Sequence, residues 1–568
     1  MAERMAIAKV AVEDLKFLNL KGKEGISQIY EFEVEMVSKD PNIDVRKMLG
    51  TNLTVEVETT TEGGSSEANE IANNPVVGTM KKMMKLAEEK AGEAAEVASI
   101  PRKVMELAIG SVGSPQKPRY FSGRVRRFEM EGPAHVHSEY YIYKATVVAP
   151  LWFLNQGKDY KIFQEKTVKD IVKEILDKFN VDHEFKLSGN YRDWGFVVQY
   201  NESCFNFISR LMEHEGMYYW FKHEDGGVKM IIADDLTASE TFPQYENLNY
   251  VSGPSQVGDT RELISSWRHT AQVTPSKYTV IDFDFRKPKT SLDTNTDNKL
   301  DGDDDIEVYE WQGGYQELAD GDCYAKLRLE EFKTPQEYIE ADTNARGVCP
   351  GYKFKLANHP RNSENIECLV LNAKYEISVH DYASGSVSQD NFETSFECLP
   401  TSIQFRAPRK TPEPKTTGPQ TATVVGPEDG KPYTEKHGRV KVHFHWDRDG
   451  KKDGEDSCWV RVSSPWASTG YGSLQIPRVG DEVIVDFIGG SPDRPIIVGR
   501  VYNEDNKNLV DMTSEAHKTG FRTRTIDGGS DNQNFMLFTD KKGEELLNIQ
   551  AEKDMKQNIK HNVFINIG

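Results

Sequence analysis

The chain has 568 residues and a formal net charge of −20; 37% of its residues are hydrophobic and 28% are charged. This length exceeds what one hydrophobic core supports, so we expect several domains. The acidic charge argues against a nucleic-acid partner and against resting on an anionic membrane surface. No apolar stretch reaches the roughly 20 residues that a membrane-spanning helix needs, so we expect no stable membrane insertion.

The six cysteines of the chain show neither zinc-type spacing nor the density of a small disulfide framework. This usage predicts reduced thiols, as in proteins of the cytoplasm. The first residues, MAERMAIAKVAVEDLKF, lack the apolar run of a secretory signal peptide. We therefore expect synthesis and assembly in the cytoplasm, with any export carried out by another machine.

The first part of the chain predicts β-strands around one helical insertion. Residues 5–60 alternate between apolar and polar types, as in Ile29–Met36, which indicates half-buried strands. Residues 62–118 have a Gly/Ser-rich start and a stretch rich in Met, Ala, Lys and Glu, which favours helices. We interpret this insertion as a solvated excursion, with a docking arm as the alternative. Strand patterns return at 119–125 and 140–143.

Two amphipathic helices are predicted next. Thr167 can cap the first, and Ser203 can cap the second, which ends at Gly216. An aromatic strand from Met217 to Phe221 and a hairpin turn at 224–227 follow.

The second half predicts a loop, a linker, a barrel and a thin terminal segment. Residues 290–305 are acidic and polar, which indicates a solvated loop, because a calcium loop needs a spaced glutamate. Residues 406–437 begin with a proline-rich stretch and are predicted as a linker. Short, closely spaced strand patterns over 438–505 favour a small OB-fold barrel.

Residues 506–568 are predicted as a connector followed by short alternating strands. The apolar positions of these strands are Leu546, Leu547, Ile549, Met555, Ile559, Val563, Ile565 and Ile567. Such runs have too little mass to form a core of their own, so neighbouring chains must bury them. The sequence thus indicates an intertwined oligomer. The pattern still continues at Gly568, which fits either a short segment or a chain that has been cut.

Several motifs, in order along nearly the whole chain, resemble a known family. They are YFSGRV at 120–125, LWFL at 151–154, KIFQEK at 161–166, VQYNES at 198–203, RLMEHEGMYY at 210–219, GRVKVHFHWDR at 438–448, QIPRVGDEV at 475–483 and PDRPIIVG at 492–499. With them the chain resembles the VgrG (valine-glycine repeat protein G) spikes of type VI secretion systems, which are similar to the fused baseplate-hub and tail-spike proteins of contractile phages.

The resemblance implies a mainly β fold with minor α. It consists of a hub of two barrel-like domains over 1–405, an OB-fold barrel and the start of an intertwined trimeric β-helix. It implies a homotrimer that caps an Hcp-like tube ring and baseplate proteins, bears a PAAR-like tip protein and effectors, and punctures a target envelope. Such a spike is secreted through the contractile machine. The alternatives are the spike of an extracellular phage-tail-like particle and, less favoured, a hydrolase or an adhesin.

One motif resembles the start of a zinc-protease helix. His214 and Glu215 begin an HExxH pattern, but Tyr218 stands where the second histidine belongs and Gly216 ends the helix. We interpret the pair as a surface-facing helix end. Glu213 and Glu215 do not form a carboxylate pair, because side chains two apart on a helix diverge.

Other candidates for metal ligands are also weak. The pairs His135/His137 and His443/His445 each share a strand face but lack a third ligand nearby. Around the second pair, the alternation places apolar residues inside and the imidazoles outside. Residues 447–455 imitate a calcium loop, yet Lys451 occupies a ligand position, which favours a glycine-punctuated turn. We therefore expect no catalytic, cofactor-binding or metal-binding residue and no enzymatic activity.

Overall fold

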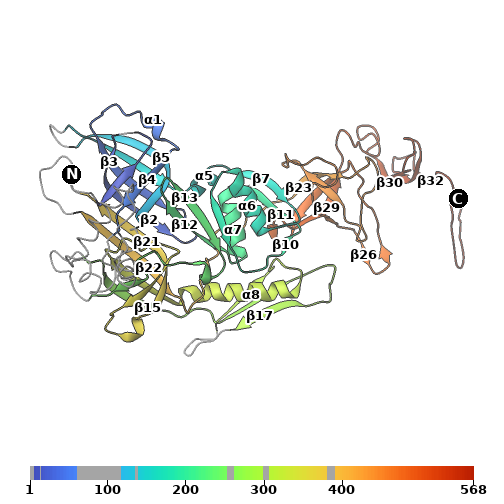
Figure 1. Ribbon diagram of the computed structural model, residues 1–568. Coiled ribbons are helices and arrows are strands. Elements are labelled where there is room, and N and C mark those ends of the chain that lie inside the picture. Colours follow the sequence, from blue (N-terminus) through green and yellow to red (C-terminus); the bar gives the residue numbers. More distant parts are fainter. Residues whose placement is uncertain are drawn as a thin grey trace, which may run out of the picture. The chain divides into compact units, whose positions relative to one another are not determined.

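The computed structural model describes residues 5–12, 14–59, 117–134, 139–251, 261–297, 306–379 and 390–568 (Figure 1). The chain forms two compact units. Unit 1 consists of residues 1–158, 167–193 and 203–412, and unit 2 of residues 159–166, 194–202 and 413–568. The predicted insertion 62–118, except 117–118, lies outside the described residues, as do His135 and His137.

Unit 1 is built on a twelve-stranded sheet. The main path runs through β1 (Ala6–Lys9), β4 (Asn52–Val57), β5 (Arg119–Pro133), β6 (Tyr141–Val148), β3 (Glu31–Ser38), β2 (Lys16–Gly25), β21 (Glu367–Ser378), β22 (Asn391–Pro400), β19 (Glu337–Thr343) and β15 (Ile264–Ala271), with β14 (Asn247–Asn249) and β20 (Lys353–Ala357) attached beside β21. Because β2 pairs with both β3 and β21, the early and late strands of unit 1 share one continuous sheet.

The period-two pattern places the core of this sheet. In β3, Phe32, Val34 and Met36 are buried, as the alternation predicted. The rings of Phe32 and Phe121 meet edge to face at 5.6 Å, and Phe121 meets Tyr375 at 4.9 Å. Aromatic rings from β3, β5 and β21 therefore hold the two halves of the sheet together.

Both predicted caps are confirmed. The Thr167 hydroxyl accepts the amide of Asp170 at 3.1 Å and begins α6 (Val168–Lys178). Ser203 accepts the amide of Asn206 at 3.0 Å and begins α7 (Cys204–His214). The predicted hairpin follows as β12 (Tyr218–Glu224) and β13 (Gly227–Ala233), and β9 (His183–Lys186) lies parallel to β13.

A helix that the sequence patterns did not indicate, α8 (Leu318–Lys333), packs against a three-stranded sheet of β17 (Leu292–Asp297), β16 (Lys277–Asp282) and β18 (Glu307–Trp311). The prediction of a solvated loop over 290–305 is wrong for β17, in which Leu292 and Thr294 are buried toward α8. Residues 298–305 lie outside the described residues. The buried positions of β17 alternate along the strand, but Thr294 at one of them is polar, so the sequence shows no apolar pattern there.

Unit 2 contains a barrel of five strands in the order β24 (Lys441–Phe444), β23 (Gln420–Val425), β28 (Glu482–Phe487), β29 (Pro495–Val501) and β25 (Arg461–Val462). A bridge between Val440 and Val460 joins the two ends of this order and closes the sheet. The linker prediction over 406–437 is therefore wrong for residues 420–425. Ala422 and Val424 are buried in the barrel core, so this strand is part of the barrel.

Two strands from the middle of the chain also belong to unit 2. β7 (Asp159–Phe163) and β11 (Val197–Glu202) pair antiparallel, and the amide of Val198 donates to Asp493 at 2.7 Å. Further short elements are α1 (Val45–Met48), α5 (Leu151–Leu154), β8 (Lys166–Thr167), β10 (Asp193–Trp194), β26 (Ala467–Ser468) and β27 (Tyr471–Gly472). Among the described helices, none combines the length and apolar character that crossing a membrane requires.

Candidate trimerisation surface

The chain after the barrel forms a three-stranded antiparallel sheet. Its strands are β30 (Lys518–Arg524), β31 (Gln533–Thr539) and β32 (Leu546–Gln550), with β31 in the centre. Gly520 lies where β30 and β31 approach closely, because a Cβ there would stand 2.1 Å from the Met536 carbonyl oxygen. Gly543, with φ of +84°, supplies the turn between β31 and β32.

One face of this sheet is apolar and exposed. Cross-strand partners point to the same side, and here Phe521 pairs with Met536, which pairs with Ile549, while Phe538 pairs with Leu547. These five side chains, which we call the apolar face, are between 40% and 66% exposed. A single chain thus leaves a compact apolar surface open to water.

Burial of the apolar face is a strong driving force for association. Fully burying one such side chain contributes about 1.5–3 kcal/mol. The opposite side of the sheet carries Arg522, Thr539 and Asn548 together with three apolar residues, of which Leu537 is buried, Phe535 is half-buried and Leu546 is 57% exposed. The apolar face gathers five exposed apolar side chains against one, Leu546, on the opposite side, so it is the side better suited to face another chain.

The predicted need for neighbouring chains extends beyond β32. Residues 551–568 form no helix or strand, and their apolar side chains are exposed. They are Met555, Ile559, Val563, Phe564, Ile565 and Ile567. The sequence had indicated Leu547 and Ile549 but missed Phe521, Met536 and Phe538, whose spacing along β30 and β31 could have signalled the same face.

Models of three protein families match successive parts of the chain. Residues 82–381 match the phage tail baseplate hub. Residues 420–502 match the type VI secretion system/phage-baseplate injector OB domain. Residues 519–568, which include the apolar face, match the C-terminal trimerisation domain of bacteriophage T4 gp5. The predicted fold class is thereby confirmed.

Relatives identify the family. The type VI secretion system spike protein VgrG1a of Pseudomonas aeruginosa is 32% identical over 554 residues, which covers 97% of this chain and 77% of the relative. The chain belongs to the VgrG spike family. VgrG1c of the same organism is 34% identical over 546 residues, covering 95% of this chain and 67% of the relative. As a VgrG spike, the chain is a structural component of a contractile injection machine.

Other proteins are similar to the chain in sequence or in fold. The Actin cross-linking toxin VgrG1 of Vibrio cholerae is 32% identical over 453 residues, which covers 78% of this chain but 40% of the toxin. In fold, the chain is similar to the E. coli c3393 protein, with a TM-score of 0.55 and 17% identity, covering 87% of this chain and 99% of that one. A Francisella PdpA–VgrG complex gives a TM-score of 0.53 at 10% identity, with 97% and 88% covered.

In this VgrG chain, the His214–Glu215 pair is packed inward, so its interpretation as a surface-facing helix end is wrong. The His214 ring meets the Tyr324 ring of α8 at 4.5 Å, and its Nε2 atom is shielded from solvent. Glu215 is buried and accepts a hydrogen bond from the Tyr324 hydroxyl at 3.0 Å. The cause is α8, which covers this helix end and which the sequence patterns did not reveal.

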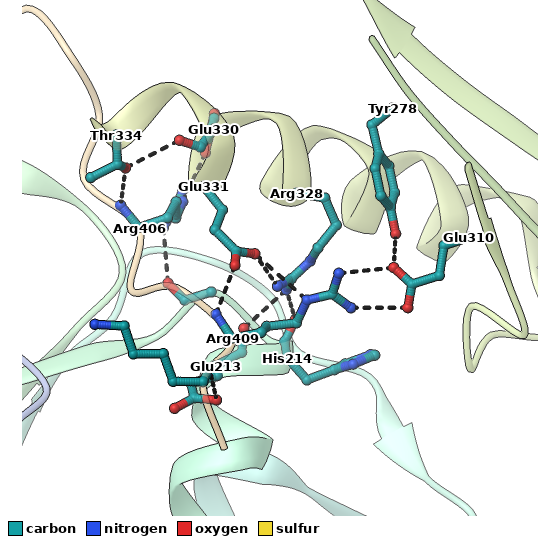
Figure 2. A network of polar contacts seen from close by, with 12 residues as sticks. Glu213, His214, Tyr278, Glu310, Arg328, Glu330, Glu331, Thr334, Arg406 and Arg409 are labelled. Carbon is teal, nitrogen blue, oxygen red and sulfur yellow. Dashed lines mark hydrogen bonds and ion pairs between the residues drawn. The ribbon is translucent and has the colours of Figure 1, made fainter. Parts of the chain in front are cut away.

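The end of α7, together with α8 and β18, instead anchors residues 406–411 of unit 1 (Figure 2). Arg409 forms two hydrogen bonds with Glu310, at 3.1 and 2.8 Å, and its amide donates to Glu331 at 2.7 Å. Arg406 donates to Glu330 at 2.8 Å. Glu213 accepts the amides of Lys410 and Thr411 at 3.1 and 3.0 Å. These carboxylates therefore hold a chain segment in place.

Burial shifts each pKa in this network toward the uncharged form, and nearby charges either add to that shift or oppose it. Burial, with the charge of Arg328 adding to it, holds the pKa of His214 well below its ordinary value. Burial likewise raises the pKa of Glu213. Burial also acts to raise the pKa of Glu310, but its hydrogen bonds to Arg409 and the charge of that guanidinium prevail and lower it.

The second histidine pair is divided by the fold. His445 is exposed as predicted, but His443 is buried and its Nδ1 lies 3.1 Å from Asp456, so the prediction that both imidazoles face outward is wrong for His443. The loop predicted as a turn folds over it, with Gly450 beside the ring. Asp456 also accepts the amides of Lys451 and Lys452, at 2.7 and 2.6 Å.

The described part of the VgrG chain contains no cluster of three or more histidine, cysteine or carboxylate side chains placed to hold a metal ion. The carboxylates that looked like ligands accept backbone amides instead. In the loop imitating a calcium site, Asp447 accepts the amides of Asp449 and Gly450, both at 3.1 Å. These loop residues stabilise a turn.

Proposed function

We propose that three copies of this chain form the spike that caps the tube of a type VI secretion system. The hub, residues 1–405 with the insertion 62–118, docks on an Hcp-like tube ring and on baseplate proteins. The C-terminal end bears a PAAR-like tip protein and carries effectors. The spike is assembled in the cytoplasm, is driven outward by contraction, pierces the target envelope and catalyses no reaction of its own.

The apolar face is the observation that carries this proposal. Three chains wrapped around one axis bury it, and they pair or cover the strand edges that would otherwise be exposed. A rod without free edges transmits thrust along its axis without being pulled apart strand by strand. The match of residues 519–568 to a trimerisation domain supports the same assembly.

Relatives support the choice of machine and of cargo. The similar spikes from Pseudomonas are named as type VI secretion components, which favours this machine over an extracellular phage-tail-like particle. One relative is named as an actin cross-linking toxin and one similar structure as a complex of VgrG with PdpA. Both names support the proposal that this spike also carries other proteins.

The solution mass of the full chain tests the assembly. Three chains of 64.4 kDa give 193.2 kDa (3 × 64.4), and light scattering should report this mass at every concentration down to the submicromolar range. A folded chain that remains a 64.4 kDa monomer contradicts the proposal.

Secretion tests the machine. The chain should appear in the culture medium of cells with an intact contractile sheath and be absent when the sheath gene is deleted, while an unrelated cytoplasmic protein stays inside in both. Release only upon lysis would favour the extracellular particle instead. Hydrolysis of peptidoglycan by the purified trimer, above the level of a heat-denatured sample, would contradict the absence of catalysis.

A further inference from the structure

A second exposed apolar surface projects from the barrel. Residues 464–476, here called the hairpin arm, contain β26 and β27 and extend away from the barrel strands (Figure 1). Trp466 is 61% exposed and Leu474 is 83% exposed. The rings of Trp466 and Tyr471 meet edge to face at 5.7 Å, so the tip of the arm presents aromatic surface to solvent.

The hairpin arm is held in one shape by its own contacts. The amide of Ser473 donates to the Trp466 carbonyl at 2.9 Å, and the Ser464 hydroxyl donates to the Ser473 carbonyl at 2.6 Å. Gly472 is required at the base, because a Cβ there would lie 2.4 Å from the Trp466 carbonyl oxygen. The arm is therefore a preformed surface, which lowers the entropic cost of binding.

The arm shares two compositional features with interface cores. Residues 462–477 contain no Asp, Glu, Lys, Arg or His, although 28% of the chain is charged. Depletion of charge together with enrichment in Trp and Tyr distinguishes the centres of protein interfaces from ordinary surface.

The base of the arm is tied to the sheet that carries the apolar face. Arg478, two residues after the arm, donates from its guanidinium to the carbonyl of Arg524, the last residue of β30, at 2.8 Å. Lys431 of the barrel forms an ion pair at 3.0 Å with Asp527 in the β30–β31 turn. These two contacts fix the base of the arm close to β30, one of the strands that carry the apolar face.

We propose that the hairpin arm is a second clasp of the trimer and is covered by a neighbouring copy of this chain. This inference rests on the trimer proposed above. A second copy is favoured over a single tip protein or effector, because a threefold spike presents three identical arms and only its own chains cover all three equally. Trp466 and Leu474 are the side chains that the neighbour buries.

Photo-cross-linking tests the clasp directly. A benzophenone amino acid replaces Trp466 in one variant, Leu474 in a second, and Glu504, whose side chain is 99% exposed in a charged loop, in a control. After the trimer mass has been verified, illumination should give a two-chain product of 128.8 kDa (2 × 64.4) from the first two variants and little from the control. Isotope-labelled and unlabelled chains are mixed before assembly. Peptide mass spectrometry should then find the cross-link between a labelled and an unlabelled chain.

A dilution experiment gives a second readout. Leu474→Ser should retain the barrel fold but raise the concentration at which the trimer dissociates about tenfold or more, because most of this side chain is available for burial. A trimer that gives no cross-links between chains from positions 466 and 474, or equal yields from position 504, contradicts the proposed role of the hairpin arm. It does not contradict the proposed trimeric spike. Cross-links only to an added tip protein or effector also contradict the role of the arm. A chain that is monomeric before illumination instead contradicts the proposed function.

Discussion

Removing apolar side chains from the apolar face should weaken the trimer by an amount that the structure specifies. Leu547 and Ile549 lie side by side on one face of β32 and are 53% and 48% exposed in the single chain. About half of each side chain is therefore left for a neighbour to bury. With about 2 kcal/mol for full burial of such a side chain, each contributes about 1 kcal/mol per chain.

The double variant Leu547→Ser/Ile549→Ser should thus lose about 2 kcal/mol per chain and about 6 kcal/mol per trimer. At 1.4 kcal/mol per factor of ten, the dissociation constant rises roughly 10⁴-fold. The midpoint concentration of a monomer–trimer equilibrium varies as the square root of that constant, so it should rise about 100-fold. Serine hydroxyls buried without partners would add to this loss.

Light scattering or mass photometry over a dilution series, after equilibration, measures the midpoint. Lys542→Ser, in the exposed turn between β31 and β32, is the matched control and should dissociate as the unmodified chain does. Far-ultraviolet circular dichroism checks that the double variant keeps its strands. If the folded double variant dissociates at the same concentration as the control, the apolar face is not the trimer contact and the reasoning fails.

Three further predictions concern the units themselves. Arg409→Ala should destabilise unit 1 by about 1–3 kcal/mol in urea unfolding, less than a fully buried pair, because Arg409 and Glu310 are each about a third exposed. As the pH is lowered below 6.5, the free energy of unfolding of the unmodified chain should decrease by at most about 1.4 kcal/mol per pH unit, because only the unfolded chain protonates His214 there. His214→Gln should remove this pH dependence. Asp456→Ala should cost unit 2 about 3 kcal/mol by releasing two amides and His443.

Matched variants make these outcomes specific. Arg268→Ala breaks an ion pair in which the arginine side chain is 73% exposed, and it should change stability by less than about 0.5 kcal/mol. Asp449→Ala, in the exposed part of the loop over His443, should also stay within about 0.5 kcal/mol. Hydrogen exchange in α8 or β24 locates each loss. Equal effects in variant and control, or an unchanged pH slope in His214→Gln, would contradict the roles assigned to the contacts.

Local signals in the sequence were sufficient where one segment determines its own structure. Thr167 and Ser203 cap their helices because each hydroxyl reaches an amide three residues on, which needs no distant partner. The alternation at Ile29–Met36 predicts β3 for the same reason, since a period of two sorts side chains onto two faces. The short alternating strands near the end have too little mass for a core of their own, so they also indicated that neighbouring chains must bury their apolar side chains.

Contacts between distant segments settled the rest. α8 lacks a clear apolar stripe and forms because its Tyr324 packs with Tyr315 and the β16–β17 sheet, with Gly321 allowing the Tyr315 ring to approach. β23 looked like a continuation of a proline-rich linker until its pairing with β24 and β28 made it part of the barrel. His443 is buried because a loop thirteen residues away in sequence, at Asp456, folds back over it.

Sequence alone therefore indicated the class of the protein, the starts of α6 and α7 and a need for neighbouring chains. Only the tertiary structure decided which side chains share the apolar face, because that depends on the register of β30 and β32 against β31. A shift of one residue would turn the opposite set of side chains outward. The strand pattern predicts that an apolar face exists, while hydrogen bonding between strands selects Phe521, Met536, Phe538, Leu547 and Ile549 as its members.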